Sequence, residues 1–248
     1  MTGGPAAEAG VAAHVVVAVE PGIGLTERFD LTGHDGHHLQ RVRRLRVGEH
    51  VTLADGFGGW RRYAVAAAGR GMLELDALGP LAHEPEIGPA VAVAAAVSKG
   101  TKLETIAAHL TELGVAEVAP LLTERSAARL DADDAARLHE RLCAVVLQAA
   151  GQSRRAWLPI VRPLGTIADL AARPGLVVAA IDGEPASAFV VGGAGATIVT
   201  GPEGGLSPAE RAQLTAMGAR SLRLGRFVLR AETAPLAAAA ILISGQVV

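Results

Sequence analysis

Hydrophobic and polar residues follow two different patterns along the chain, and the change between them falls near residue 80. Before that point short apolar stretches alternate with polar positions, which predicts β-strands with one buried face. The expected strands cover residues 14–19, 50–55, 61–68 and 72–78. A short helix and turn is expected at residues 36–49. We therefore predict a small, mostly β domain within residues 1–80.

Residues 78–89 carry three prolines and no periodicity, so we assign residues 81–90 as a linker. Beyond the linker, continuous apolar stretches predict buried strands, at residues 90–97, 115–122, 176–181 and 196–200. Helices are expected between them. Thr101 with Glu104, and Thr166 with Asp169, have the form of capping boxes that open helices.

A further helix is expected from about Asp133 to Ala150, and Gly114 is placed to end the helix that begins near Thr101. Strands and helices thus alternate through residues 91–248. This alternation predicts an α/β domain with a largely parallel sheet covered by helices on both faces. Such sheets bind ligands at the carboxyl ends of their strands.

Composition places the chain among globular proteins, since half of its residues are apolar and 19% are charged. No apolar run reaches the roughly 18 residues that a membrane helix needs, and the N-terminus lacks the features of a signal peptide. We therefore expect a cytoplasmic protein without a membrane span. The single cysteine, Cys143, agrees with a reducing compartment, and we expect it on the buried face of a helix.

The formal net charge of −2 argues mildly against nucleic-acid binding, but arginines gather in one stretch of the first domain. They are Arg41, Arg43, Arg44, Arg46, Arg61 and Arg62. This cluster fits a phosphate-binding patch and, equally well, a solvated charged face. Asp35 with His34, His37 and His38 resembles a metal cluster, yet no cysteine completes a tetrahedral set, so we expect no metal.

A glycine-rich loop follows the last buried strand. The strand ends at Thr200, and the loop Gly201–Gly205 leads to Ser207, Pro208 and Glu210, which have the form of a helix cap. Glycines allow the backbone to approach a ligand closely, so the pattern is typical of a ligand loop. The loop lacks the lysine of a phosphate-binding loop and is not a GxGxxG motif. An ordinary tight turn explains it equally well.

A second polar cluster, Arg226, Arg230, Glu232 and Thr233, lies directly before a helix made almost entirely of alanine and leucine. Charges in such buried surroundings are costly unless they are paired, which favours a pocket where an arginine and a carboxylate serve chemistry. A purely structural salt bridge between Arg230 and Glu232 is the alternative interpretation.

Six segments, in this order and at these separations, resemble one known family. They are HHLQRVRRLRVGE, VSKGTKLETIAAHLTELGV, LLTERS, AAGQSRR, GPEGGLS and LGRFVLRAETA. The resemblance is to the bacterial 16S rRNA uridine N3 methyltransferases of the SPOUT superfamily, and it spans nearly the whole chain. It implies a small PUA-like β-barrel that binds RNA, followed by a SPOUT α/β domain with a C-terminal trefoil knot.

The resemblance also implies a cofactor and site residues. S-adenosylmethionine would be held by Thr200, Gly201, Glu203, Gly204, Gly205, Leu224, Gly225, Leu229 and Thr233. The chemistry of the reaction gives two matching residues candidate roles: Arg230 would stabilise negative charge on the uracil, and Glu232 would accept the proton or orient the base. Which of the two drives deprotonation stays open at this point. RNA contacts would come from Arg41, Arg44, Lys99, Arg154 and Arg155. Phe227 stands where relatives commonly carry an arginine.

The implied partners are 16S rRNA of the small ribosomal subunit and a second copy of the chain. In this superfamily the cofactor pocket lies beside a subunit interface, and the alanine-rich final helix allows close packing in a symmetric homodimer. Two other functions fit the same residues. One is a nonenzymatic RNA-binding or ribosome-assembly factor in which the glycine loop is only a turn, and the other is a small-molecule α/β enzyme that binds a different nucleotide.

Overall fold

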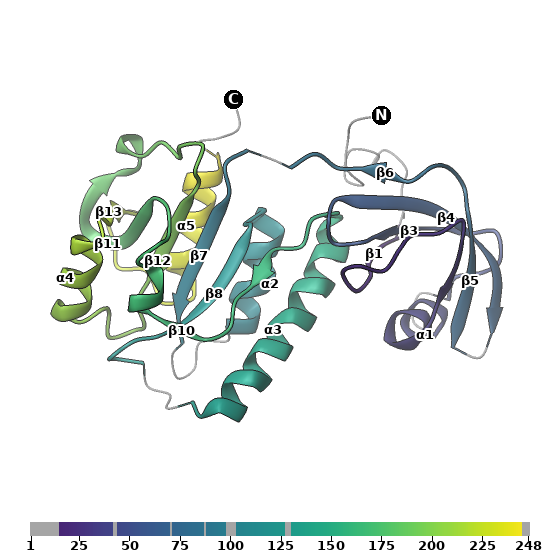
Figure 1. Cartoon of the computed structure of the whole chain (residues 1–248), viewed down its shortest axis with the longest axis horizontal. Coiled ribbons are helices and arrows are strands. Elements are labelled where there is room, and N and C mark those ends of the chain that lie inside the picture. Colours follow the sequence, from purple (N-terminus) through teal and green to yellow (C-terminus); the bar gives the residue numbers. More distant parts are fainter. Residues whose placement is uncertain are drawn as a thin grey trace. The chain divides into compact units, whose positions relative to one another are not determined.

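A computed structural model describes residues 15–41, 44–69, 71–86, 88–97, 103–126 and 130–244 (Figure 1). The chain forms two compact units. The first contains the residues up to Glu86 together with Leu147–Leu158, and the second contains the rest. The division into two functional domains, joined by a linker at residues 81–90, stays a prediction.

The first unit is built on a curled, mostly antiparallel sheet of six described strands in the order β1-β3-β4-β5-β2, with β6 paired to β4. They are β1 (Val15–Ala18), β2 (Arg28–Leu31), β3 (His50–Ala54), β4 (Gly59–Gly69), β5 (Met72–Ala77) and β6 (Ala82–His83). The helix α1 (Gly33–Arg41) packs against β5. The four expected strands and the helix are confirmed, whereas β2, with two charged residues among its four, and β6, with only two residues, were not predicted.

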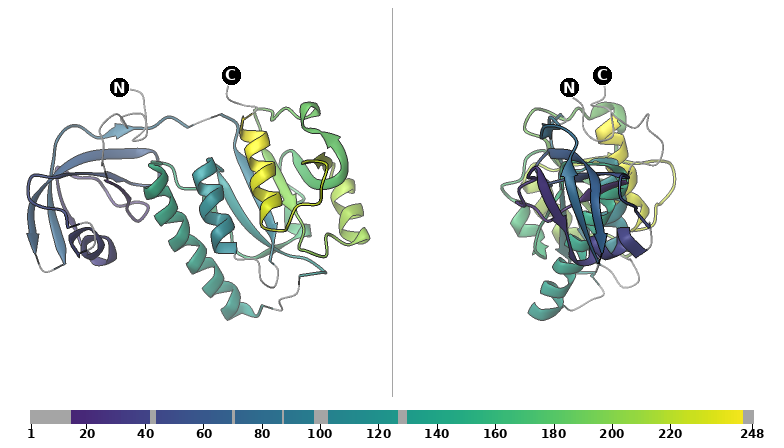
Figure 2. Two further views of the ribbon diagram at one scale, coloured as in Figure 1. Left: turned by 180° about the vertical axis from the view of Figure 1, so that it is seen from behind. Right: turned by 90° about the vertical axis from the view of Figure 1, so that its right-hand side faces the viewer.

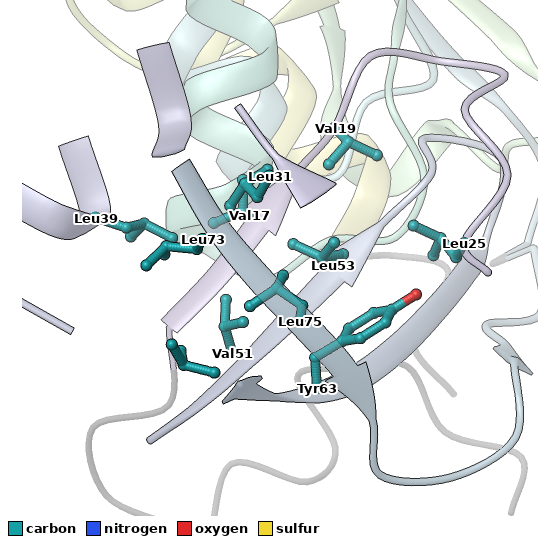
Figure 3. Close-up of a cluster of buried hydrophobic side chains, with 11 residues drawn as sticks. Val17, Val19, Leu25, Leu31, Leu39, Val51, Leu53, Tyr63, Leu73 and Leu75 are labelled. Carbon is teal, nitrogen blue, oxygen red and sulfur yellow. The ribbon is translucent and has the colours of Figure 1, made fainter. Parts of the chain in front are cut away.

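A cluster of eleven buried apolar side chains, drawn in Figure 3, forms much of the core of this unit. Tyr63 lies fully buried in it, on β4. The Tyr63 hydroxyl donates a hydrogen bond of 2.8 Å to the carbonyl oxygen of Thr26, and burial raises the pKa of this phenol. The one polar atom of the ring is therefore satisfied while its apolar body fills the core.

A segment from the middle of the chain, Leu147–Leu158, completes the first unit. Glu84 holds it with two groups: its carboxylate accepts a hydrogen bond of 2.8 Å from the amide of Ala156, and its carbonyl accepts one of 2.8 Å from the Trp157 indole. These partners lie 72 and 73 residues apart in sequence. Local patterns do not reveal such a connection.

The second unit contains a seven-stranded sheet in the order β10-β8-β7-β12-β11-β13, with β9 paired to β8. All of its described pairs are parallel, as the alternation of strands and helices predicts. The strands are β7 (Val91–Ala96), β8 (Glu117–Leu122), β9 (Ile160–Val161), β10 (Gly165–Thr166), β11 (Leu176–Pro185), β12 (Ala196–Thr200) and β13 (Arg220–Arg223).

Helices cover both faces of this sheet. Those described are α2 (Leu103–Leu113), α3 (Ala132–Ser153), α4 (Pro208–Ala216) and α5 (Thr233–Ser244). The helices α2 and α5 lie side by side, and α5 contacts β7 and β12 (Figure 2). The buried Leu214 of α4 packs with Val199 of β12. No helix in the described part of the chain is long and apolar enough to cross a membrane.

Two expectations about the helices need correction. The capping box at Thr166 and Asp169 is present, but it opens only a four-residue 3-10 helix, η1 (Ile167–Leu170). Pro174 follows closely, and a proline disfavours helical backbone in the residue before it. Cys143 is exposed, because the buried face of α3 runs through Leu138, Leu142 and Val146 instead. One position further along a helix points about 100° away from that face.

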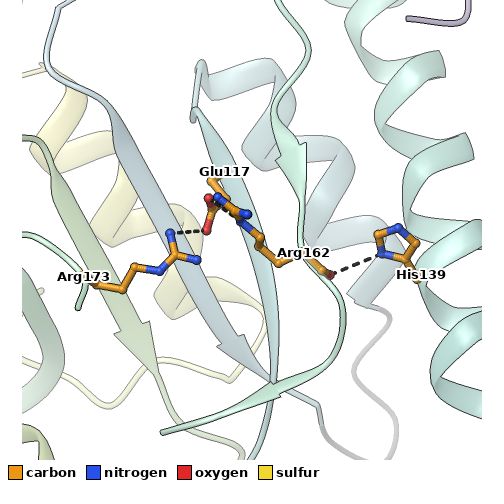
Figure 4. A network of polar contacts seen from close by, with 4 residues as sticks. All are labelled: Glu117, His139, Arg162 and Arg173. Carbon is orange, nitrogen blue, oxygen red and sulfur yellow. Dashed lines mark hydrogen bonds and ion pairs between the residues drawn. The ribbon is translucent and has the colours of Figure 1, made fainter. Parts of the chain in front are cut away.

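A buried carboxylate at the start of β8 ties the second sheet to the segment that follows α3 (Figure 4). The carboxylate of Glu117, whose side chain is 8% exposed, lies 2.7 Å from Arg162 Nε and 2.6 Å from Arg173 Nη1. A buried charge with two well-placed partners stabilises their positions, whereas the loss of one partner leaves the others uncompensated.

We therefore expect Glu117→Gln to lower the free energy of unfolding by about 2 kcal/mol, because two partly buried guanidinium groups lose their charge partner. The matched control is Glu104→Gln, which removes an ion pair of 2.9 Å with Arg141 on the more exposed surface. That change should cost at most about 1 kcal/mol. Chemical denaturation of the three proteins measures the difference, and equal losses in both variants would contradict this view of Glu117.

Candidate functional site

A cavity of about 720 Å³ opens at the carboxyl ends of β12 and β13, beside the middle of β11. Three segments form most of its lining: Val178–Ile181 in β11, Thr200–Glu203 with Gly205 and Leu206 at the end of β12, and Leu224, Gly225 and Phe227–Glu232 after β13. Arg211 of α4 and Ala234 of α5 complete it. This is the edge where parallel α/β sheets bind their ligands. The glycine-rich loop and the Arg230 segment, separate in the sequence, are therefore walls of one site.

The glycine-rich loop is held by the cap of α4. The side chains of Ser207 and Glu210 form the expected capping box, and Pro208 occupies the first turn. Gly205 has a φ of +68°, which favours glycine, and its amide donates to the carbonyl of Pro202. A Cβ on Gly201 would lie 2.9 Å from the backbone nitrogen of Leu206. The loop is therefore close-packed where it borders the cavity.

The loop after β8 supports the glycine-rich loop from outside. The amide of Glu124 donates a hydrogen bond of 2.8 Å to the carboxylate of Glu210, and Arg125 Nη1 donates one of 2.7 Å to the carbonyl of Gly204. Arg125 is absent from the residues singled out from the sequence. In the sequence, Arg125 stands out only as part of the LLTERS motif. Its hydrogen-bond partner, Gly204, lies 79 residues away, so no local pattern reveals the contact.

The segment after β13 turns into α5 at Arg230. The carbonyl of Arg230 accepts the amides of Thr233 and Ala234, each at 3.0 Å, so the side chains of Arg230 and Glu232 extend from the start of the helix. Their charged atoms lie 3.7 Å apart, and the side chains are 84% and 49% exposed. The expectation that these charges are buried is wrong. The segment lies on the cavity wall, where both groups can meet a substrate.

Phe227 lines the same cavity with its side chain 77% exposed. The neighbouring Val228 is also exposed and also lines the cavity, so the rim is apolar at this point. The guanidinium of Arg226 lies 6.0 Å from the centre of the Phe227 ring, at the limit of a cation–π contact. This rim offers a flat apolar surface next to Arg230.

Most residues that the family resemblance assigns to the cofactor or to catalysis line this cavity. They are Thr200, Gly201, Glu203, Gly205, Leu224, Gly225, Leu229, Arg230 and Glu232. Gly204 and Thr233 adjoin it in sequence but are not among its lining residues. The two loops are thus brought together as expected, while the role of each residue stays a prediction.

The arginines expected to contact RNA lie in the first unit, and they differ in environment. Arg41 and Arg44 are exposed. Arg155 is not, and burial lowers the pKa of its guanidinium, an effect that Glu84 opposes. Lys99 lies outside the described residues.

The arginines do not form one free cluster, because Arg61 donates hydrogen bonds to the carbonyls of Gly79 and Leu25. Arg43 lies outside the described residues, as do the side chains of His34 and His38. Among the residues that the structure describes, no three His, Cys, Asp or Glu side chains form a group that could hold a metal ion.

Two family models match parts of the chain. A family model of an RNA methyltransferase domain matches residues 85–243, and a model of an RNA methyltransferase PUA domain matches residues 31–77. Ribosomal RNA small subunit methyltransferase E of Mycobacterium tuberculosis is 37% identical over 212 residues, which cover 82% of this chain and 80% of the relative. The Bacillus subtilis protein of the same name is 31% identical over 84% and 86% of the two chains.

A solved structure agrees in fold over nearly the whole length. Ribosomal RNA small subunit methyltransferase E from Neisseria gonorrhoeae, bound to S-adenosyl methionine, has a TM-score of 0.82 and is 25% identical. The match covers 92% of this chain and 95% of that chain. Fold, cavity and family models together define an S-adenosylmethionine-dependent RNA methyltransferase with a PUA domain. More narrowly, the chain belongs to the ribosomal RNA small subunit methyltransferase E family.

The cavity fits S-adenosylmethionine. Its volume of about 720 Å³ is in the range of small-molecule sites. Apolar side chains such as Val178, Leu206 and Leu229 line it and suit a purine ring, while the glycine-rich loop offers backbone groups at close range. A Cβ on Gly201 would lie 2.9 Å from the backbone nitrogen of Leu206, so a side chain at this position would displace the loop.

We expect Gly201→Ala to weaken S-adenosylmethionine binding by about tenfold or more, equivalent to about 1.4 kcal/mol, because the loop must shift to admit the methyl group. Gly192→Ala is the control, since a Cβ there meets no atom within 4 Å and Gly192 is not among the residues that line the cavity. Its affinity should stay within about twofold of the unaltered protein. Calorimetry measures the S-adenosylmethionine affinity of both variants. Equal affinities in the two variants would show that Gly201 does not border the bound cofactor.

Proposed function

We propose that this chain transfers a methyl group from S-adenosylmethionine to N3 of a uridine in 16S rRNA of the small ribosomal subunit. The observation that carries the proposal is the position of Arg230 and Glu232, which stand accessible on the wall of the cavity beside an apolar rim. The names of the relatives support the small ribosomal subunit as the substrate. The N3 atom rests on the family resemblance and on the chemistry below.

The reaction requires help with one proton. Uridine N3 is a weakly acidic imide, and its proton must leave before or while the nitrogen attacks. S-adenosylmethionine supplies a methyl group on a positively charged sulfur that is already a good leaving group, so the reaction needs no metal ion as electrophile. What remains for the protein is to orient the base and to favour its anion.

Arg230 and Glu232 divide this task in the proposal. The guanidinium of Arg230 stabilises the negative charge that grows on a uracil carbonyl oxygen as the proton departs. The carboxylate of Glu232 accepts the proton or hydrogen-bonds the base in the reactive orientation. Their charged atoms lie 3.7 Å apart, which is long for an ion pair. Little interaction free energy is therefore lost when a substrate oxygen takes the place of Glu232 beside Arg230, or a substrate N–H takes the place of Arg230 beside Glu232.

The proposal assigns the cofactor to the two loops. Thr200, Gly201, Glu203, Gly204 and Gly205 would hold it from one side, and Leu224, Gly225, Leu229 and Thr233 from the other. By the family resemblance these loops belong to a trefoil knot in the domain of residues 91–248, which pairs with a second copy in a homodimer. The domain of residues 1–80 would bind rRNA, with 81–90 as linker, in the cytoplasm where small subunits mature.

A nonenzymatic RNA-binding or assembly factor is the second candidate. The exposed Arg41 and Arg44 support RNA binding in either case. A close-packed glycine wall around a cavity of about 720 Å³ favours the enzyme, since a simple turn needs neither. Mass spectrometry of 16S rRNA from a strain without this protein tests the proposal: one missing methyl group on a uridine supports it, and unchanged methylation contradicts it.

Replacing Arg230 by alanine should slow methyl transfer by about a hundredfold or more, the scale for removing one donor aimed at developing charge. Cofactor affinity and melting temperature should change little, because an exposed ion pair is worth about 0–1 kcal/mol. Raising the pH should restore part of the rate, since hydroxide then ionises the imide. Single-turnover rates at saturating cofactor measure the effect.

Glu232→Gln serves as the comparison for Arg230→Ala. If the two residues only brace the loop, both changes should reduce cofactor affinity together and leave the rate at saturation intact. A near-normal single-turnover rate for Arg230→Ala would end its catalytic assignment.

Replacing Arg41 and Arg44 together by alanine should weaken rRNA binding and reduce the slope of log affinity against log salt by about two, because about one counterion is released per phosphate contact. Cofactor affinity should not change. The control is Arg28→Ala, which removes an exposed arginine of the same unit that pairs with Asp76 at 3.5 Å. A salt slope equal to that of the unaltered protein excludes Arg41 and Arg44 from the RNA contact.

A further inference from the structure

Phe57 presents an aromatic ring to solvent on the loop between β3 and β4. The chain has only four phenylalanines, two tryptophans and one tyrosine, so aromatic surface is scarce. The Phe57 side chain is nevertheless 56% exposed, whereas Trp60 and Tyr63 of the following strand are buried. The ring therefore contributes little to the core, and its position calls for another explanation.

The backbone around Phe57 is fixed by Asp55 and by two glycines. One carboxylate oxygen of Asp55 accepts the amides of Phe57 and Gly59, at 2.8 and 2.9 Å. Gly56 and Gly58 have φ values of +82° and +87°, which favour glycine. A Cβ on Gly56 would lie 2.7 Å from the Leu158 side chain, and one on Gly58 would lie 2.6 Å from the Trp157 indole.

The segment Leu147–Leu158 clamps this loop from the other side. The amide of Gly58 donates to the carbonyl of Ala156, and the amide of Leu158 donates to the carbonyl of Gly56, each at 3.0 Å. Trp157 packs edge-on against His83, with ring centres 5.5 Å apart. The exposed ring is thus held by a rigid backbone, which lowers the conformational entropy lost when a partner binds.

Positive charge accompanies the ring. The segment Leu147–Leu158 contains Arg154 and Arg155 and no acidic residue. Arg155 lies near Glu84, but none of the described residues forms an ion pair with Arg154. Arg154 has a φ of +60° in the turn that leads to Ala156 and Trp157. A cation and a flat apolar ring therefore occur on two segments that are hydrogen-bonded to each other.

We propose that Phe57 is a stacking platform for an unpaired base of the rRNA substrate, and that Arg154 contacts a phosphate of the same RNA. Single-stranded RNA is commonly bound by aromatic rings that stack on bases beside cations that meet the backbone. The neighbours Gly56 and Gly58 have no side chains to obstruct a planar base. An apolar protein partner fits less well, because the ring is flanked by glycines and by charge. This inference rests on the proposed function, which supplies the rRNA.

The experiment compares substitutions at Phe57 in steady-state methylation of small ribosomal subunits. Phe57→Ala and Phe57→Leu should raise KM for the RNA substrate by about tenfold, within the range for removing one stacked base, and Phe57→Tyr should stay within about twofold of the unaltered enzyme. The kcat and the S-adenosylmethionine affinity should not change. Leu81→Ala, which alters a similarly exposed aliphatic side chain of the same unit, should have no effect on KM.

Direct binding separates this inference from the proposed function. Fluorescence anisotropy with a 16S rRNA fragment needs no methyl transfer, so it tests Phe57 even if the chain methylates another site. Weaker RNA binding by Phe57→Leu, with normal RNA binding by Phe57→Tyr, supports stacking. Arg154→Gln should reduce the slope of log affinity against log salt by about one. Full binding by Phe57→Leu would indicate a general apolar contact, such as a protein surface, and would overturn the proposal. So would full binding by Phe57→Ala.

Discussion

The buried carboxylate of Glu210 determines the geometry of the glycine-rich loop that lines the cavity. One of its oxygens accepts the amide of Ser207 and caps α4, while the other accepts the amide of Glu124 in the loop after β8. A single side chain thus pairs two backbone donors, and the amide of Ser207 is buried, where an unpaired donor costs about 1–3 kcal/mol. The glycine-rich loop lies between these two anchors, so its shape follows from them.

Glu84 and Glu117 act in the same way elsewhere in the chain. Glu84 joins the segment Leu147–Leu158 to the first unit, and Glu117 joins Arg162 and Arg173 to the second sheet. The core itself is rich in alanine and valine, which bury modest area per residue. Irregular segments with few apolar anchors are consequently held by hydrogen bonds and ion pairs of these glutamates, and a hydrogen bond to a carboxylate is directional, so it fixes a position rather than merely a distance.

The sequence is most informative where structure depends on neighbours along the chain. The strands β7 and β12, the helix α2 and the cap at Ser207 follow from apolar runs and side-chain chemistry within a few residues. The contacts of Arg125 with Gly204 and of Glu84 with Ala156 span 79 and 72 residues and leave no local signal. The length of η1 also depends on the residues that follow its cap. The exposure of Cys143 depends on which face of α3 the core covers.

The candidate site shows the same limit at the level of single side chains. Arg155 and Arg230 are both arginines in motifs shared with the family, and the sequence alone does not show which of them solvent reaches. In the structure Arg155 is only half-exposed, with Glu84 nearby, whereas Arg230 is open to the cavity with a loose partner. A half-buried guanidinium near a carboxylate must leave these surroundings before it can bind a phosphate, which costs free energy. An exposed guanidinium has no such barrier, and so the environment, rather than the residue type, separates an arginine that supports the fold from one that can meet a substrate.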